Sequence, residues 1–472
     1  MINIKRQFGK FAAVLVLLIL TACATYYKKN IQFQEYVQQG RFEKAEATLE
    51  SNKKAQSGRN QMLYHFEHGY VDWMLSNYHE SNEHLAKADR LIEDQLKNYG
   101  REALALITNP SVKPYQPEDF EVVMVNYFKA LNYLALNDYE AALVECRKIN
   151  NKLHTLNDKY KDHKNLYQRD AFAHTLMGLI YEANSDYNNA FIAYRNALEV
   201  YEEDYLREFG FGPPRQLKMD ILRTAYLTGF YEEVRYYEKK FDFSYEHKLN
   251  NEKDLVFFWL NGFGPVKSEW SLNLTNVKGE GGWITFANEK YDISVPVYIG
   301  DKKEEEKSAF RNLRFLRIAF PKYEERKPVY SNALIKIDNK TKKLELLQNI
   351  NEIAFKTLRD RMIREVSNSV LRLATKKALE ALASEQDEGL GTLVSITNAL
   401  TEKADTRNWQ TLPYSISYAR IPFPDDGKFT LKTINTNGAN NTYQINASPS
   451  SKKISFFTFH TIDTHRPGAW TP

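Results

Sequence analysis

Between about residues 26 and 240 the apolar positions recur every three or four residues, which is the period of an amphipathic helix. Within this region one phrase repeats: an aromatic residue, a small residue three positions later, and another large residue four further on. A small side chain lets two antiparallel helices approach closely, while the aromatic side chain fills the space beside it. The pattern therefore predicts a row of helix pairs. The repeated positions are Phe42, Ala45 and Leu49; Tyr78, Ser81, Leu85 and Ala88; Tyr139, Ala142 and Cys146; Tyr187, Ala190, Tyr194 and Ala197; and, more weakly, Tyr231 and Val234.

The fourth copy resembles a tetratricopeptide repeat (TPR) at nearly every signature position. It carries Gly178, Tyr181, Tyr187, Ala190, Tyr194 and Ala197. The resemblance implies a TPR-like α-helical solenoid over residues 23–245, with the signature residues in the core and ligand contacts on the concave face. The copies are spaced less regularly than the ~34 residues of a regular array, so insertions are expected. The candidate insertions are Asn109–Pro117, Asn157–Asn165 and Gly210–Pro214.

After Lys240 the pattern becomes that of β-strands, with short apolar runs separated by turn-forming and charged residues. Turns are predicted at Gly262–Pro265, at Asp426-Gly427 and at Asn437-Gly438, and an exposed loop tip at Asp301–Lys307. The predicted strands are Leu255–Leu260, Trp270–Leu274, Trp283–Ala287, Ile293–Ile299, Leu313–Phe320, Leu334–Ile337, Leu412–Ile421, Lys428–Ile434, Thr442–Ile445 and Lys453–Phe459.

A helical period returns between about residues 351 and 384, where apolar residues recur at steps of three and four. Lysine and arginine occupy much of the remaining surface, so this basic amphipathic helix has two interpretations. It either packs one apolar face on the sheet or lies on an anionic lipid or polymer. Core packing is favoured because Asp360, Glu365 and Glu380 interrupt the positive charge. The apolar positions are Phe355, Leu358, Met362, Val366, Val370 and Leu373.

Together these patterns predict an α+β protein in which a helical solenoid is followed by a β-rich domain interrupted by long helices. The expected parts are a signal peptide (1–22), the TPR-like repeats (23–245), the first part of the β-rich domain (246–350), a helical insertion (351–408) and the C-terminal part of the β-rich domain (409–472).

The first 23 residues change the picture, because they have the order of a bacterial lipoprotein export signal. A basic start precedes an apolar run from Phe11 to Leu20, which is shorter than the ~20 residues of a spanning helix. Thr21 and Ala22 then leave room for a peptidase before the thiol of Cys23. The segment resembles a lipobox, which implies a mature chain that begins at a lipidated Cys23. Because Ala24 rather than aspartate follows, the resemblance implies a lipid anchor in the outer membrane, facing the periplasm.

Charge and cysteine content exclude several classes of function. Removing the signal takes three of the 64 basic residues, which leaves 61 against 60 acidic residues. Such a balanced chain has no net field to steer nucleic acid, so no nucleic-acid partner is expected. With Cys23 acylated, Cys146 is the only remaining thiol, so no internal disulfide can form. No motif supplies a base beside Cys146, which favours a buried packing residue over a nucleophile.

No catalytic or metal-binding motif is present, and no cofactor is expected. The nearest approaches to a zinc site are His65 with His68 and His79 with His84, but neither pair has the spacing of a zinc hydrolase. Surface histidines on repeat helices are the favoured interpretation. Phosphate-binding glycine loops and nucleophile elbows are likewise missing. The chain is therefore predicted not to be an enzyme.

The phrase from Glu402 to Pro413, Glu-Lys-Ala-Asp-Thr-Arg-Asn-Trp-Gln-Thr-Leu-Pro, resembles the most recognisable block of an uncharacterised bacterial repeat-containing lipoprotein family. Gly262–Lys267 and Phe320–Tyr323 resemble weaker signatures of the same family. The family has no established activity, and its setting is similar to that of lipoproteins that assist peptidoglycan synthases.

Within this phrase Asp405, Arg407 and Trp409 have two interpretations. In the first, a carboxylate and a guanidinium pair at a helix-to-strand junction that Trp409 anchors in the core, which is the favoured interpretation. In the second, the same three residues form a ligand site.

The sequence thus favours a lipid-anchored, non-catalytic scaffold or assembly factor that binds a protein partner in the cell envelope through its repeats. The membrane partner is reached through the lipid on Cys23. The alternative function is recognition of peptidoglycan or another envelope glycan.

Overall fold

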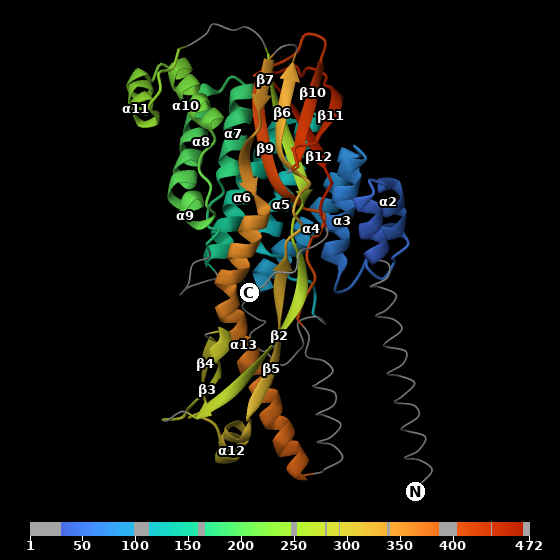
Figure 1. Ribbon diagram of the computed structural model, residues 1–472, viewed down its shortest axis with the longest axis vertical. Coiled ribbons are helices and arrows are strands. Elements are labelled where there is room, and N and C mark those ends of the chain that lie inside the picture. Colours follow the sequence, from blue (N-terminus) through green and yellow to red (C-terminus); the bar gives the residue numbers. More distant parts are fainter. Residues whose placement is uncertain are drawn as a thin grey trace.

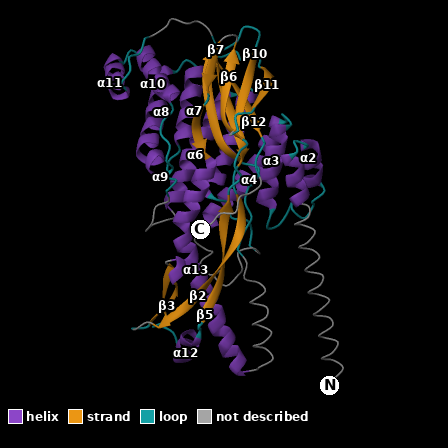
Figure 2. Ribbon diagram, viewed as in Figure 1, coloured by secondary structure: helices purple, strands orange, loops and turns teal. Residues whose placement is uncertain are grey.

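A computed structural model describes residues 30–98, 113–158, 166–246, 253–278, 281–291, 293–337, 340–386, 404–435 and 437–465. The predicted signal peptide (1–22) and the predicted lipidation site, Cys23, lie outside these residues. The described chain is a mixed α+β protein with a helical N-terminal half, and strands dominate the rest (Figure 2). Among the described helices, none combines the length and the apolar character needed to cross a bilayer.

The helical half consists of antiparallel pairs, as the repeats predict. Residues 30–38 pair with α2, α3 pairs with α4, α5 with α6, α7 with α8, and α10 with α11. The row runs from α2 at one side to α11 at the other (Figure 1). The helices are α2 (Phe42–Glu50), α3 (Gln61–Met74), α4 (Tyr78–Asn98), α5 (Asp119–Ala135), α6 (Tyr139–Asp158), α7 (Ala171–Ala183), α8 (Tyr187–Val200), α9 (Leu206–Glu208), α10 (Arg215–Thr228) and α11 (Tyr231–Phe241).

Every pair turns in the same way. The residue two positions before each repeat aromatic has a positive φ, and the backbone N–H of the next residue donates to the carbonyl five residues before it, in the first helix. This is a Schellman motif, which satisfies the free carbonyls of the helix that ends there. The aromatic residue then begins the second helix of the pair. The left-handed residues are Gly40, Ser76, Asn137, Ser185 and Gly229, and the aromatic residues are Phe42, Tyr78, Tyr139, Tyr187 and Tyr231.

Close approach within the pairs explains two glycines. A Cβ atom on Gly178 would lie 2.4 Å from the ring of Tyr194, and one on Gly69 would lie 2.6 Å from Leu85. No real Cβ atom tolerates such distances. The helices α7 and α8, and likewise α3 and α4, are therefore in backbone-to-side-chain contact at these points. The regular superhelix of a TPR array stays a prediction.

Strands form three four-stranded sheets. The first sheet has the order β12-β1-β9-β8, the second β11-β10-β6-β7, and the third β4-β3-β2-β5. β1 is parallel to β12 and antiparallel to β9. The strands are β1 (Asp254–Phe263), β2 (Val266–Lys278), β3 (Trp283–Asn288), β4 (Ile293–Tyr298), β5 (Phe315–Glu324), β6 (Tyr330–Ile337), β7 (Lys340–Lys343), β8 (Glu345–Asn349), β9 (Pro413–Pro422), β10 (Lys428–Asn435), β11 (Asn440–Asn446) and β12 (Ile454–Thr461).

The first sheet is the middle layer of the molecule, between the helix pairs and the second sheet (Figure 1). Successive side chains of β1 point to opposite faces. Val256, Phe258 and Leu260 join the core shared with the helices, whereas Leu255, Phe257 and Trp259 join the core shared with the second sheet. A strand buried on both faces reads as an unbroken apolar run, which explains the sequence from Leu255 to Leu260.

The third sheet lies apart, at the lower end of the molecule in Figure 1. The turn Gly262–Pro265 carries the chain from the first sheet into it. Two helices cover one face of this sheet: α12 (Glu304–Asn312) and α13 (Ile350–Gln386). Val370 and Leu373 of α13 are buried against it, as expected for core packing. The strands expected to form one β-rich domain (246–350 and 409–472) are thus divided among three sheets, and only the first two combine strands from both sides of α13.

Two predictions for this part were wrong. The run Asp301–Lys307 was expected to be a loop tip, but Glu304 begins α12. Three glutamates in its first turn interact favourably with the positive end of the helix dipole, and Arg311 does so with the negative end. The helical insertion was expected to reach residue 408, but residues 404–408 are not helical. Residues 387–403, between α13 and this segment, lie outside the described part of the chain.

Candidate functional site

The segment 404–412 contains the three candidate residues and contacts α3 and α5. Trp409 is 1% exposed and stacks on Phe66 of α3, with ring centroids 4.4 Å apart. Its backbone N–H donates to Oε1 of Glu121 at 2.7 Å, and its indole N–H donates to Thr411 at 2.8 Å. Trp409 therefore links this segment to two helices of the repeats, α3 and α5.

Asp405 and Arg407 form a forked ion pair near the surface. Nε and Nη2 of Arg407 donate to the two carboxylate oxygens of Asp405 at 2.8 and 2.6 Å. The guanidinium also donates to the carbonyl of Lys113 at 3.1 Å and to Oδ1 of Asn60 at 3.0 Å. It lies over the ring of Tyr115, 5.5 Å from the centroid. Every one of these contacts is made to the protein itself, so the pair fastens the segment to the start of α3 and to the chain before α5.

The structure thus places all three candidate residues in one segment but does not direct them towards a common point. Trp409 points into the core, whereas Asp405 and Arg407 lie at its edge with side chains 22% and 14% exposed. This geometry is that of a segment that joins helices to strands, and we call residues 404–412 the connector.

Three buried glutamates surround this connector, and the sequence analysis missed them. Burial raises the pKa of Glu67 and of Glu121 to about 7, against the lowering effect of their hydrogen bonds. Burial also acts on Glu118, but Arg361 and Lys267 outweigh it and hold the pKa of its carboxyl at about 2. A glutamate in a helical sequence is normally predicted to be exposed. Nothing in the sequence therefore showed that these three glutamates are buried.

A cavity of about 500 Å³ lies beside the connector. Residues 30–38, α2 and α3 form one wall, and residues 406–410 form another. Its charged lining includes Glu67, Lys267, Arg326 and Arg407. Arg326 is 2% exposed and already donates to the carbonyl of Gly264 at 2.7 Å and to that of Gln410. Its cation is therefore directed at backbone oxygens and not at the cavity alone.

The inner face of the helix pairs is occupied by the chain's own strands. Tyr139 donates to the carbonyl of Ile454 on β12 at 2.8 Å, and the hydroxyl of Tyr70 lies 3.0 Å from Nδ1 of His460 on the same strand. Farther along the row, Tyr201 donates to the carbonyl of Leu347 on β8 at 2.7 Å. The first sheet therefore covers the surface on which a TPR array would hold a ligand.

At the far end of the row, the described residues leave part of α10 and α11 exposed. Four apolar side chains at the α10–α11 turn are exposed, and we call them the end patch. Tyr226 and Tyr231 pack on each other with ring centroids 5.7 Å apart. The end patch consists of Tyr226 (37% exposed), Leu227 (37%), Phe230 (38%) and Tyr231 (55%).

The two remaining sequence predictions concern cysteine and histidine. Cys146 is fully buried, as predicted, and burial raises the pKa of its thiol, so the reactive thiolate does not form at neutral pH. His65 and His68 were expected to lie on the surface, and this was wrong: they are 7% and 4% exposed. Both face α4, where His84 meets them, whereas His79 is exposed.

No family model and no curated protein sequence matches the chain. Partial likeness links it to three solved structures. The apo form of RapI has a TM-score of 0.31 and 13% identity over 46% of this chain and 71% of its own. BtubC (BKLC) from P. vanneervenii has a TM-score of 0.30 and 12% identity over 47% and 83%. NprR in complex with its cognate peptide NprX has a TM-score of 0.19 and 17% identity over 45% and 65%. At these TM-scores the likeness carries no argument about fold or function.

Proposed function

We propose that the chain is a lipid-anchored, non-catalytic scaffold that binds a protein partner in the cell envelope through the open end of its helix row. The end patch is the observation that carries this proposal. Cys23 supplies the anchor, and the sequence after it favours the outer membrane, with the body facing the periplasm. A tether of this kind raises the effective concentration of the scaffold near partners in the same membrane.

The end patch lies where another helix pair would pack. In a repeat array each pair is covered by the next, and a terminal pair normally presents a polar outer face. Here the repeat aromatic of the last pair, Tyr231, is 55% exposed, whereas its equivalents Phe42, Tyr78, Tyr139 and Tyr187 are buried or half-buried. The partner chemistry that fits such an end is an amphipathic helix whose apolar face extends the row. The inner face is not available, because the first sheet covers it.

A photocrosslinking amino acid at position 231 tests this surface in intact cells. We expect one reproducible partner, crosslinked through an amphipathic helix, and loss of that crosslink when Leu227→Glu is added. Phe315 of the third sheet is 68% exposed and lies far along the chain, so the same crosslinker at position 315 is the matched control. Recovery of no reproducible partner from position 231 would sink the scaffold proposal.

The anchor has a separate test. Cys23→Ser should abolish incorporation of radiolabelled palmitate and leave the precursor unprocessed. Cys146→Ser is the control, because it removes the only other cysteine and should leave labelling intact. Continued labelling of the Cys23→Ser protein would refute the anchor.

Glycan binding is the second candidate, and an exposed aromatic pair favours it. Trp283 and Tyr298 on neighbouring strands of the third sheet are 47% and 46% exposed, with ring centroids 5.0 Å apart. Adjacent exposed rings of this kind offer an apolar platform to the face of a sugar. The test is sedimentation with purified sacculi: a glycan-binding chain sediments and Trp283→Ala weakens this, whereas a scaffold for proteins stays in the supernatant.

A further inference from the structure

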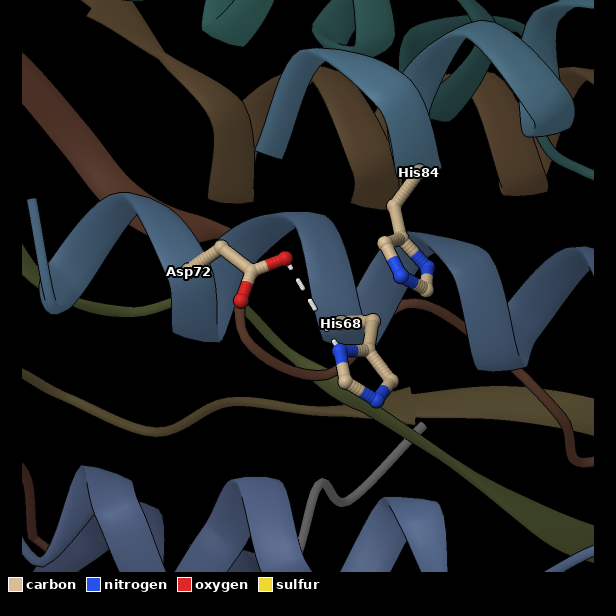
Figure 3. Close-up of side chains that lie close together, drawn as sticks. All are labelled: His68, Asp72 and His84. Atoms are coloured by element: carbon tan, nitrogen blue, oxygen red, sulfur yellow. Dashed lines mark ion pairs between the residues drawn. The ribbon is translucent and has the colours of Figure 1, made fainter. Parts of the chain in front are cut away.

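One buried polar cluster in the helix pairs takes no part in the proposed partner surface. His68 and Asp72 lie one turn apart on α3, and His84 faces them from α4 (Figure 3). A nitrogen or oxygen atom from each of the three side chains lies within 4.8 Å of the others. We call these three residues the His–Asp cluster.

The cluster contains unsatisfied polar atoms. His68 is 4% exposed and Asp72 is 2% exposed, yet within the described part of the chain both ring nitrogens of His68 and Oδ2 of Asp72 have no hydrogen-bond partner. Nδ1 of His68 lies 3.8 Å from Oδ2 of Asp72, which is too far for a hydrogen bond. Buried polar groups are almost always paired, so this arrangement requires an explanation. A cation between the three side chains would satisfy His68 and Asp72 at once.

The two imidazoles of the cluster lie against each other. The rings of His68 and His84 stack with centroids 4.2 Å apart and planes inclined by 14°.

His65 holds the ring of His84 in place. Nδ1 of His65 lies 3.1 Å from Nδ1 of His84, so one of these nitrogens donates a hydrogen bond to the other. Metal-binding histidines commonly use one ring nitrogen for the ion and the other for such a positioning contact. This leaves Nε2 of His84 for a ligand. His65 is thus a positioning residue.

The surrounding charges are mixed. Glu46 on α2 interacts electrostatically with Asp72 and with His68, and Glu50 adds negative charge beside Glu46. Lys87 and Arg90 on α4 contribute positive charge near the histidines. Charges of both signs therefore surround the cluster.

We propose that the His–Asp cluster binds a divalent transition-metal ion of the Zn²⁺ class, with His68, His84 and Asp72 as ligands and a fourth position for water. Two imidazoles and one carboxylate are a ligand set that Zn²⁺ accepts. Ligand atoms around tetrahedral Zn²⁺ lie ~3.3 Å apart, given bond lengths of ~2.0 Å. Because a metal ion lies in the plane of each imidazole, the ring of His68 must turn out of its stack on His84 before both can bind the ion. The ion would clamp α3 to α4.

The test is metal binding by the full-length protein purified in detergent. We expect one equivalent of Zn²⁺ to survive dialysis, measured by mass spectrometry of the metal, and the melting temperature to rise on its addition. His84→Gln and Asp72→Asn should each weaken binding about tenfold or more and abolish the rise in melting temperature. Both are close in size to the native residues, and circular dichroism checks that they fold.

The control is His154→Ala. His154 forms an i, i+4 pair with Asp158 at 3.9 Å, matching His68 and Asp72, but both side chains are exposed by at least 78%. This variant should bind Zn²⁺ like the wild type. No stoichiometric binding by the wild type, or binding that survives in both His84→Gln and Asp72→Asn, would overturn the proposal.

Discussion

Arg420 of β9 and Glu182 of α7 form a forked ion pair, with Nη1 and Nη2 donating to the two carboxylate oxygens at 2.7 and 2.9 Å. Arg223 of α10 binds the same carboxylate through a second fork, at 2.7 and 2.9 Å. Glu182 is 3% exposed, so one buried carboxylate joins α7, α10 and the first sheet. The two guanidiniums outweigh the effect of burial and lower the pKa of Glu182.

Glu182→Ala should therefore destabilise the protein strongly. Breaking a buried pair by removing one partner costs about 3–5 kcal/mol, because the remaining charges lose their counterion. The free energy of unfolding, measured by urea denaturation, checks this. Glu232→Ala is the control: it breaks a pair with Arg235 in which Glu232 is 89% exposed, and such pairs contribute about 0–1 kcal/mol. Equal losses in the two variants would contradict the proposed importance of burial.

Glu182 also illustrates what the sequence does and does not reveal. The aromatic repeats located the second helix of every pair correctly, because each aromatic residue begins its helix after a left-handed turn residue. These are local signals. Nothing local marks Glu182 as buried or identifies Arg420, 238 residues away, as its partner.

The division of the strands among three sheets could not be predicted from the sequence for the same reason. The apolar run from Leu255 to Leu260 predicted a strand, and β1 is there. Its parallel neighbour β12 lies about 200 residues away in the chain, and no periodicity specifies that pairing. The sequence singled out Asp405, Arg407 and Trp409, whereas the contacts of Trp409 with Glu121 and Phe66 depend on how the sheets pack on the helices.

Trp409→Ala should weaken the packing of the connector on the helices and so lower the free energy of unfolding. Truncating a fully buried tryptophan leaves a cavity and costs about 3–5 kcal/mol. Trp283→Ala is the control, since Trp283 is 47% exposed and its truncation should change the free energy of unfolding much less. Urea denaturation of both variants makes the comparison. A loss at Trp409 no larger than that at Trp283 would show that the stacking on Phe66 contributes little.

Glu118→Gln should destabilise the protein in a pH-dependent way. The pKa of Glu118 is about 2 in the folded chain against 4.5 for an unperturbed glutamate, so its charge stabilises the fold above pH 4.5. This contribution, roughly 3 kcal/mol from the pKa difference, is lost as the pH falls from 4.5 towards 2. The difference between wild type and variant should therefore be largest near neutral pH and shrink in acid.

The measurement is urea denaturation at a series of pH values. Glu304→Gln is the control, because its carboxyl also has a lowered pKa but is fully exposed beside Lys307, where solvent screens the interaction. Its stability difference from the wild type should be small at every pH. A constant difference between wild type and Glu118→Gln across the range would argue against the ion pair with Lys267 and Arg361.

Gly178→Ala tests the contact between α7 and α8. Alanine is favoured over glycine in a helix by about 1 kcal/mol, so helix propensity alone predicts stabilisation. The added Cβ would instead lie 2.4 Å from the ring of Tyr194, and overpacking of this kind costs about 1–3 kcal/mol. We therefore expect a net loss in the free energy of unfolding. Gly212→Ala is the control, because its Cβ would meet only Leu206, at an ordinary 3.9 Å.

The same substitution in a second protein variant identifies the cause of the expected loss in stability. In a Tyr194→Leu protein the ring that meets the new Cβ is gone, so Gly178→Ala should cost less there than in the wild type. The difference between the two costs is the coupling energy of positions 178 and 194. Additive effects would mean that the loss arises elsewhere, whereas a positive coupling would assign it to the close approach that the repeat's small residue permits.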